Sequence, residues 1–169
     1  PKLSLTIQAD EGLTAGSESY ITAWVSDQND MLVAGDTDDF IWNVSNSELL
    51  RLEKADSTNE MIMIGLAPGM VNITVTWKED PSCTAYYTIN VEKAEYNYIS
   101  AWAPPRLTTA AEDAYMYADL RDQYGHHIIS EQVAVTIVNT SVISLTPDPE
   151  DSTRYLITPL AVGTTEIVF

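Results

Sequence analysis

Residues 63–77 read Met-Ile-Gly-Leu-Ala-Pro-Gly-Met-Val-Asn-Ile-Thr-Val-Thr-Trp. An apolar run ends at Leu66, and Ala67-Pro68-Gly69 has the composition of a tight turn, because Pro fixes φ and Gly accepts positive φ. From Val71 to Trp77, apolar and polar residues alternate strictly. This period of two is typical of a strand with one face in a core and the other in water. The segment therefore predicts an antiparallel β-hairpin.

The hairpin recurs at the end of the sequence, in residues 156–169. Leu66-Ala67-Pro68-Gly69 matches Leu160-Ala161-Val162-Gly163. The segments 41–52 and 134–145 match one another at nearly the same spacing. Self-similarity at a constant period indicates repeated domains. We expect two copies of one domain, residues 1–93 and residues 94–169.

The repeated residues resemble a known family. The first copy contains Trp42, Ser45-Asn46 and Leu49-Leu50-Arg51-Leu52, followed by Gly65-Leu66-Ala67-Pro68-Gly69 with Ile73-Thr74-Val75. This pattern resembles the bacterial immunoglobulin-like domain, group 2, over most of both copies, although the second copy has Val135 in place of the Trp. The resemblance implies an all-β fold of two tandem immunoglobulin-like β-sandwiches. It also implies a non-enzymatic structural spacer or adhesion module of a larger bacterial cell-surface or secreted protein.

The alternation also predicts which residues form the core of the first copy. Trp42 shares its parity with Phe40 and Val44, so we expect its indole to lie buried between the two sheets. Tyr87, Ile89 and Val91 are expected to form the last strand of the first sandwich. The period is two throughout, so no helix is expected, and residues 27–39 are expected to form a polar loop that only Met31-Leu32-Val33 interrupts.

The second copy is expected to lack its last strand. In the repeat alignment Phe169 corresponds to Val75, so no residues correspond to Tyr87–Val91. The exposed sheet edge could be completed by further residues of a longer polypeptide or by a strand from another chain, as in donor-strand complementation. Because the sequence begins at Pro1 without a signal peptide, we expect it to be a piece of a longer exported polypeptide.

The charge excludes several classes of partner. The chain has 25 acidic and 8 basic side chains, a net charge of -17, and both copies are acidic. Such a field repels phosphate groups, so we expect no binding to nucleic acid or to anionic membrane surfaces. No apolar run is long enough for membrane insertion. We expect an extracellular or cell-surface location.

Catalysis has little support in the sequence, and we predict that the protein is not an enzyme. His126 and His127 are adjacent, beside a Tyr124-Gly125 turn, and are interpreted as polar loop residues. Cys83 is the only cysteine, which precludes an intramolecular disulfide, and no basic neighbour is present to lower the pKa of its thiol. No motif supplies a nucleophile together with a base and a residue that orients it.

Two kinds of binding site are candidates. Aromatic residues on the expected outer faces could stack on sugar rings or contact a host or cell-surface protein, and the alternative is contact with a neighbouring domain of the same polypeptide. These residues are Tyr20, Trp24, Tyr115 and Tyr117, and a further aromatic candidate, Trp102, lies in the opening strand of the second copy. Asp36, Asp38 and Asp39 are candidate ligands for Ca²⁺, with a plain solvated loop as the alternative. No other cofactor is expected.

Two further functions remain as alternatives to the spacer or adhesion module. One is a carbohydrate-binding module attached to a secreted glycoside hydrolase, for which an exposed aromatic surface would be the binding site. The other is a decoration domain of a phage or virion. The motifs describe a strand framework, and a framework of this kind supports many functions.

Overall fold

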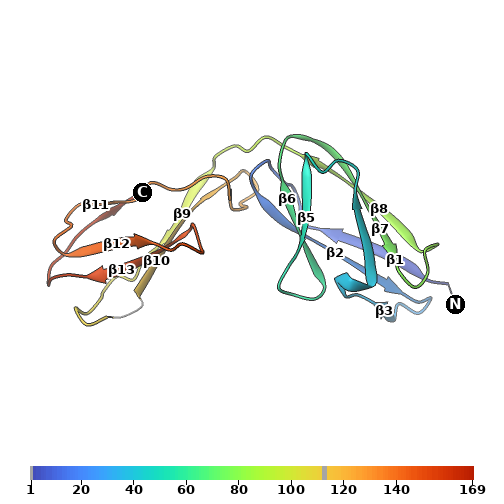
Figure 1. Cartoon of the computed structure of the whole chain (residues 1–169), viewed down its shortest axis with the longest axis horizontal. Coiled ribbons are helices and arrows are strands. Elements are labelled where there is room, and N and C mark those ends of the chain that lie inside the picture. The colour runs from blue at the N-terminus through green and yellow to red at the C-terminus, as the bar shows by residue number, and fades with distance from the viewer. Residues whose placement is uncertain (1, 112–113) are drawn as a thin grey trace. The chain divides into compact units, whose positions relative to one another are not determined.

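The computed structural model describes residues 2–111 and 114–169, which are divided into two compact units (Figure 1). The first unit ends at Glu95 and the second begins at Tyr96, two residues after the boundary predicted from the sequence. Each unit is described by itself below. Among the described residues, no helix combines the length and the apolar character that a membrane span requires.

The first unit contains two antiparallel sheets. One has five strands, with β1, β2, β6 and β5 in spatial order and β3 also paired to β2; the other has β4, β7 and β8 in that order. The strands are β1 (Ser4–Ala9), β2 (Glu18–Ser26), β3 (Leu32–Ala34), β4 (Phe40–Val44), β5 (Leu50–Lys54), β6 (Glu60–Gly65), β7 (Gly69–Trp77) and β8 (Thr84–Val91).

The second unit also contains two antiparallel sheets. One has β12, β13, β10 and β9 in spatial order, and the other pairs β11 with β14. The strands are β9 (Tyr98–Trp102), β10 (Ala114–Arg121), β11 (Thr136–Ile137), β12 (Ile143–Pro147), β13 (Arg154–Pro159) and β14 (Ile167–Val168).

The strand order is that of an immunoglobulin sandwich. Without the short β3, the seven strands of the first unit divide into an A-B-E-D sheet (β1-β2-β6-β5) and a C-F-G sheet (β4-β7-β8). The second unit repeats this order as β9-β10-β13-β12 and β11-β14. The predicted all-β fold of immunoglobulin-like sandwiches is therefore confirmed, and the position equivalent to β8 holds no strand among the described residues of the second unit.

The core of the first unit lies between its two sheets, and the predicted parity holds there. Val71, Ile73 and Val75 of β7 are buried, as are Ile89 and Val91 of β8. Buried side chains of the facing sheet, which include Ile21, Val25, Leu50 and Met63, complete the cluster together with Leu13 of the segment between β1 and β2. Apolar burial of this kind contributes about 25 cal/mol per Å², so the buried alternating residues stabilise the sandwich.

Trp42 is only partly buried, which corrects the prediction of a fully buried indole. It has the expected orientation, since it packs against the core and contacts the ring of Phe40 edge to face at a centroid distance of 6.4 Å. Its strand β4 is an edge strand that pairs only with β7, so one side of the indole reaches the sheet margin. There Nε1 donates a hydrogen bond to the carbonyl of Thr37 at 3.4 Å.

The segment expected to be a polar loop, residues 27–39, contains two regular elements. β3 pairs with β2 beside a bulge at Val25 and Ser26. A 3-10 helix, η1 (Thr37–Asp39), follows it and leads directly into β4. This single 3-10 turn is too short to produce a helical period in the sequence, and it leaves the predicted all-β fold unchanged.

The same backbone hydrogen bond occurs at the repeated turn within each unit. The amide of Leu66 donates to the carbonyl of Leu49 at 2.8 Å, and the amide of Leu160 donates to the carbonyl of Val142 at the same distance. A Cβ on Gly69 would lie 2.7 Å from Leu49, and one on Gly163 would lie 2.9 Å from Val142. A side chain at either position would therefore displace the tip of Leu49 or Val142, and at Gly69 the positive φ of 154° also favours glycine.

Candidate functional site

The outer face of the β9-β10-β13 sheet carries three of the aromatic candidates. Met116 and Ala118 of β10 are buried in the core of the second unit, so Tyr115 and Tyr117 lie on the opposite face. The register of β9 and β10 places Trp102 directly opposite Tyr117. The structure therefore brings Trp102, Tyr115 and Tyr117 to one sheet face, which we call the aromatic face.

Two of these rings form an exposed pair. The centroids of Trp102 and Tyr117 lie 6.5 Å apart with their planes inclined by 42°. Their side chains are well exposed, with 59% of Trp102 and 40% of Tyr117 accessible to solvent. Exposed aromatic pairs with polar neighbours are typical of surfaces that contact a ligand, because each ring offers apolar area at a low cost in conformational entropy.

Arg154 of β13 continues the aromatic face. It lies opposite Tyr117 in the strand register, and its Cζ is 4.9 Å from the centre of the Tyr115 ring, which is a cation–π contact. Its Nε donates to Asp148 Oδ2 at 2.7 Å. The pKa of Asp148 lies below its usual value, chiefly because its carboxylate accepts a hydrogen bond from the amide of Glu150 and secondly because of Arg154. The guanidinium is therefore held in a defined orientation beside the rings.

A second ion pair lies on the same sheet face. Asp119 pairs with Arg121, and the register places these residues opposite Ser100 and Tyr98 of β9. The carboxylate of Asp119 is buried, whereas the Arg121 side chain is partly exposed. The aromatic face thus combines stacking surface with hydrogen-bond donors, a combination that suits a polar ligand with apolar faces.

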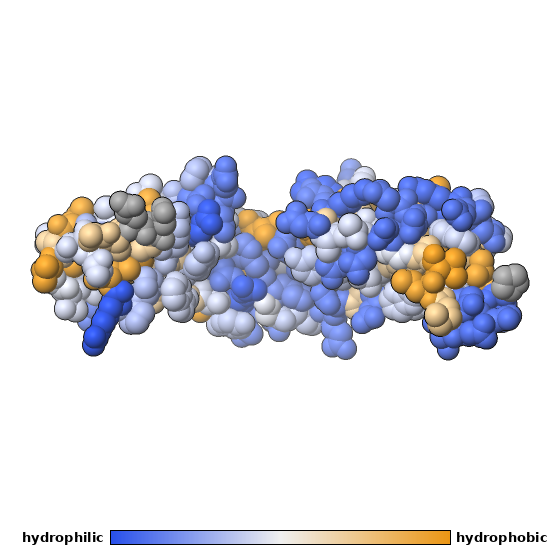
Figure 2. All heavy atoms as spheres, turned by 90° about the horizontal axis from the view of Figure 1, so that it is seen from below, coloured by the Kyte–Doolittle hydropathy of each residue, from blue (hydrophilic) through white to orange (hydrophobic). Residues whose placement is uncertain are grey.

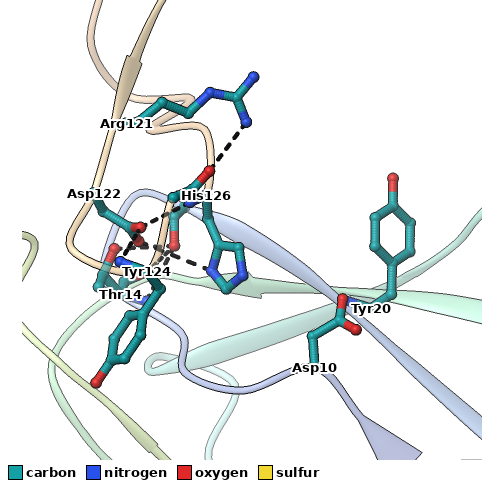
Figure 3. Close-up of polar contacts among 9 residues, drawn as sticks. Asp10, Thr14, Tyr20, Arg121, Asp122, Tyr124 and His126 are labelled. Atoms are coloured by element: carbon teal, nitrogen blue, oxygen red, sulfur yellow. Dashed lines mark hydrogen bonds and ion pairs between the residues drawn. The ribbon is translucent and has the colours of Figure 1, made fainter. Parts of the chain in front are cut away.

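Tyr20 and Trp24 lie on the outer face of β2 in the first unit, as predicted from their parity. Tyr20 is exposed, and its amide donates to the carboxylate of Asp10 at 3.2 Å (Figure 3). Trp24 is half-buried and lines a hollow with Leu32 and Val33 of β3.

The surface at β3 was missed as a binding candidate in the sequence. Met31, Leu32 and Val33 are all exposed, and Figure 2 shows apolar surface gathered over the β3 end of the first unit. The signal was present, since these three apolar residues interrupt an otherwise polar segment. An apolar group on a polar loop is a feature of contact surfaces.

Two of the three aspartates proposed for Ca²⁺ have partners within the first unit. Asp38 pairs with the ammonium group of Lys54, which lowers the pKa of that carboxyl. Asp39 Oδ2 accepts hydrogen bonds from the amides of Gly35 and Asp36 at 3.2 and 3.1 Å. Within residues 2–111 and 114–169, no three acidic, histidine or cysteine side chains are grouped closely enough to hold a metal ion.

The turn that contains His126 is built around Asp122 (Figure 3). Oδ1 of Asp122 accepts hydrogen bonds from the amides of Tyr124 and His126 at 2.9 and 2.8 Å, while its own amide donates to the carbonyl of His126 at 3.0 Å. Arg121 donates to the carbonyl of Gly125 at 3.2 Å. His126 Nδ1 lies 4.0 Å from Asp122 Oδ2.

The same turn occurs in the first unit without a histidine. Asp27 Oδ1 accepts from the amides of Asn29 and Met31 at 2.8 and 3.0 Å, and the amide of Asp27 donates to the carbonyl of Met31 at 2.9 Å. Met31 therefore occupies the position of His126. The contact of His126 with a carboxylate is a consequence of turn geometry, which agrees with its interpretation as a loop residue.

Cys83 has the electrostatic environment of an unreactive thiol. Its pKa is raised, first by burial and second by the negative charge of Asp80. Asp80 itself is held ionised, because hydrogen bonds from Ser82 lower the pKa of its carboxyl. Since the thiolate is the nucleophilic form, this environment disfavours covalent chemistry at Cys83.

Comparisons with known proteins give structural neighbours only. No protein-family model and no curated protein sequence matches the chain. The solved structures that it resembles include domains 4–9 of the surface layer protein SbsC, at 15% identity and a TM-score of 0.48, with 98% of this chain and 29% of that chain covered.

Two further neighbours are a bacterial adhesin and a bacterial invasin. FdeC, an adhesin of Escherichia coli, is similar at 13% identity and a TM-score of 0.40, with 99% of this chain and 60% of that chain covered. Invasin, a bacterial integrin-binding protein, is similar at 15% identity and a TM-score of 0.40, with coverage of 96% and 35%. The chain spans less than two thirds of each of these proteins.

Proposed function

We propose that this chain is a non-enzymatic structural or adhesion module of a larger bacterial cell-surface or secreted protein, built from two tandem copies of a group 2 bacterial immunoglobulin-like domain. Three features support the tandem copies: the common strand order, the Asp27 and Asp122 turns, and the matched hydrogen bonds of Leu66 and Leu160. The neighbouring domains of the same polypeptide are its first partners. On this proposal the module lies at the cell surface or outside the cell.

The observation that carries the adhesion role is the aromatic face. Trp102 and Tyr117 are exposed in a defined mutual geometry, and Arg154 is fixed beside them by Asp148. Because these groups need not move to meet a partner, binding would cost little conformational entropy. The proposed ligand is a host or cell-surface protein with an acidic or aromatic contact, which Arg154 and the rings would recognise.

The same face supports the second candidate function, a carbohydrate-binding module. Sugar rings have apolar faces that stack on aromatic side chains and hydroxyl groups that pair with arginine and carboxylate groups. The inclined Trp102 and Tyr117 rings, with two ion pairs beside them, present both kinds of group. A virion decoration domain remains a third prediction, for which the aromatic face gives no specific support.

The test compares ligand classes and variants on the same chain. Binding is measured to a glycan array and to bacterial or host cells, before and after their surface protein has been removed by protease. Trp102→Ala should weaken binding about tenfold or more, the loss expected for an aromatic at the centre of an interface. Tyr86→Ala is the matched control, because Tyr86 is an exposed aromatic of the first unit that lies outside the aromatic face.

The outcomes separate the functions. Retention of glycans by the wild-type chain, lost in Trp102→Ala, supports the carbohydrate-binding module. Protease-sensitive binding to cells, lost in the same variant, supports the adhesion module. If no ligand is retained, or if Tyr86→Ala loses as much binding as Trp102→Ala, the aromatic face has no binding role and only the structural spacer is left.

A further inference from the structure

Three consecutive apolar side chains are exposed in the first unit. Met31, Leu32 and Val33 have 66%, 69% and 47% of their surfaces accessible to solvent. Single exposed apolar residues are common on folded proteins, but a run of three is unusual unless it contacts a partner. Of the residues of β3, Ala34 alone is buried in the core. The packing of the sandwich therefore does not explain why this run is apolar.

The run borders a hollow in the sheet. β2 pairs with β6 as far as Thr22 and with β3 from Val25, so Ala23 and Trp24 lie between the two pairings. The hollow at this place has a volume of about 720 Å³, within the range of roughly 300–1,000 Å³ that is usual for ligand sites. We call the run and the hollow together the β3 surface. Residues that line the hollow include Trp24, Leu32, Val33, Asp36, Thr58 and Asn59.

Carboxylates flank the apolar run on both sides in the sequence. The segment 27–39 contains no basic side chain. Its acidic residues are Asp27, Asp30, Asp36, Asp38 and Asp39. Two of them, Asp36 and Asp39, also line the hollow, and Figure 2 shows hydrophilic surface beside the apolar patch. The β3 surface thus has an apolar centre with an acidic rim.

Basic side chains of the first unit neutralise only part of this rim. The ammonium group of Lys54 pairs with the carboxylate of Asp38, and Lys78 donates to the carbonyl of the same residue. Among the described residues, no basic side chain forms an ion pair with Asp30 or Asp36, and both are exposed. The rim therefore keeps a negative potential around the apolar residues.

This pattern selects among the possible occupants. A second copy of the chain would bring one acidic rim against another, and an anionic membrane would be repelled in the same way. A segment that carries both apolar and basic side chains complements the surface, because its apolar groups cover the run while its charges meet the rim. Removal of water from an exposed apolar patch that is rimmed by polar groups is the usual driving force at such contact sites.

We propose that the β3 surface docks a basic segment of a partner protein. An apolar side chain of the segment enters the hollow against Trp24 and Leu32, and its Lys or Arg side chains pair with Asp30 and Asp36. The site lies in the first unit, whereas the aromatic face lies in the second, so this proposal goes beyond the function proposed above and does not depend on it.

The test uses three synthetic peptides of seven residues and the whole chain. In the first peptide lysine alternates with leucine; in the second glutamate replaces lysine; in the third serine replaces leucine. Isothermal titration calorimetry should give saturable binding of the first peptide with a Kd below about 1 mM. The other two should bind at least about tenfold more weakly, because each lacks one of the two complementary groups. Binding of the first should weaken as salt rises, since salt screens the exposed charges.

Two pairs of variants locate the binding. Leu32→Ser should weaken binding of the lysine–leucine peptide about tenfold, and Met70→Ser, which removes another exposed apolar side chain of the same unit, should not. Asp30→Asn combined with Asp36→Asn should weaken it severalfold and reduce its dependence on salt. Asn accepts the positive φ of 60° at Asp30 and keeps an oxygen at the N-cap of η1.

The matched control for charge is Glu11→Gln combined with Glu48→Gln, which removes two exposed charges of the first unit that do not line the hollow. Equal weakening in both charge variants, or in Leu32→Ser and Met70→Ser, would overturn the proposal, because binding would then reflect the net charge of the chain. Equal affinity for the glutamate–leucine peptide would also contradict it.

Two further measurements cover the other occupants. Light scattering of the wild-type chain should show no dimer that Leu32→Ser dissociates, because such a dimer would assign the β3 surface to a second copy. Phosphatidylcholine vesicles should not retain the chain. Retention that is lost in Leu32→Ser would assign the surface to a membrane, and either result would overturn the proposal of a basic protein segment.

Discussion

Gly65 has no space for a side chain. A Cβ at this position would lie 2.2 Å from the carbonyl oxygen of Thr14, which is backbone and cannot move aside. We therefore expect Gly65→Ala to destabilise the first unit by about 3 kcal/mol, the upper part of the usual range for overpacking. Chemical denaturation measures the loss. Gly35→Ala is the control, since its Cβ would meet only the side chain of Leu32 at 3.5 Å; equal losses would contradict the assignment to a backbone clash.

Because of Asp27, the stability of the first unit should change with pH in the acid range. Hydrogen bonds from the amide of Met31, and then from Asn29, lower the pKa of its carboxyl in the folded state. A lowered folded pKa gives stability that is present above the unfolded value of about 3.9 and is lost as the pH falls through the folded pKa. Asp27→Asn keeps an oxygen acceptor and removes the charge.

The variant should therefore melt below the wild type at neutral pH, and the difference should shrink towards about pH 2. Thermal melts across the acid range measure this difference. Glu48→Gln, which removes one exposed charge from the same unit, corrects for the general effect of net charge. A difference that stays constant from neutral to acid pH would show that the charge of Asp27 has no part in the turn.

At the scale of residues, the sequence predicts which face of a sheet a side chain occupies better than it predicts how deeply the side chain is buried. Alternation correctly assigned Val71, Ile73 and Val75 to the core, because parity decides which face a side chain occupies. Parity also gave the orientation of Trp42 but overestimated its burial. Burial depends on whether a strand lies at the centre or the edge of its sheet, and that depends on pairing between segments distant in the sequence.

At the scale of elements, the two aspartate turns provide a controlled comparison. Asp122→Ala should cost about 1–3 kcal/mol, because the amides of Tyr124 and His126 lose a buried acceptor. His126→Met should cost less, since Met31 occupies this position in the first unit. Chemical denaturation of both variants checks this order. A larger loss in His126→Met would indicate a role for the imidazole that the turn does not explain.

The stability of the η1 segment should not depend on calcium. Asp38 is paired with Lys54, and Asp39 accepts from two backbone amides, so both carboxylates already have partners in the structure. We expect millimolar Ca²⁺ to leave the melting temperature of the first unit unchanged, with Mg²⁺ as the control for ionic strength. An increase specific to Ca²⁺ that is lost in Asp39→Asn would restore the calcium site predicted from the sequence.

The aromatic face shows where prediction from the sequence ends. The parity of β10 placed Tyr115 and Tyr117 on an outer face from the sequence alone. Pairing Tyr117 with Trp102 required the register of β9 against β10, and Arg154 beside Tyr115 required that of β13. A one-residue slip would move Trp102 to the other face. The segments between these strands are too long for a turn type to fix their register from the sequence.

At the scale of the whole molecule, the two units share a strand order but differ in the size of their cores. The first core combines buried residues from both sheets, including four of β7 and two of β8. Among the described residues of the second unit, the buried members of the core cluster are Met116, Ala118, Val133, Ile143 and Ile157. A smaller buried apolar area gives a smaller free energy of unfolding. The second unit should therefore be the less stable of the two.

We expect this difference to appear as two thermal transitions, with the second unit unfolding first. Hydrogen exchange assigns them: at temperatures between the transitions, amides of β10 and β13 should exchange while those of β2 and β7 remain protected. Met116→Ala should lower only the first transition, and Ile73→Ala only the second, because each side chain is fully buried in the core of its own unit. A single transition lowered by both variants, or earlier exchange in β7 than in β10, would contradict the expected order.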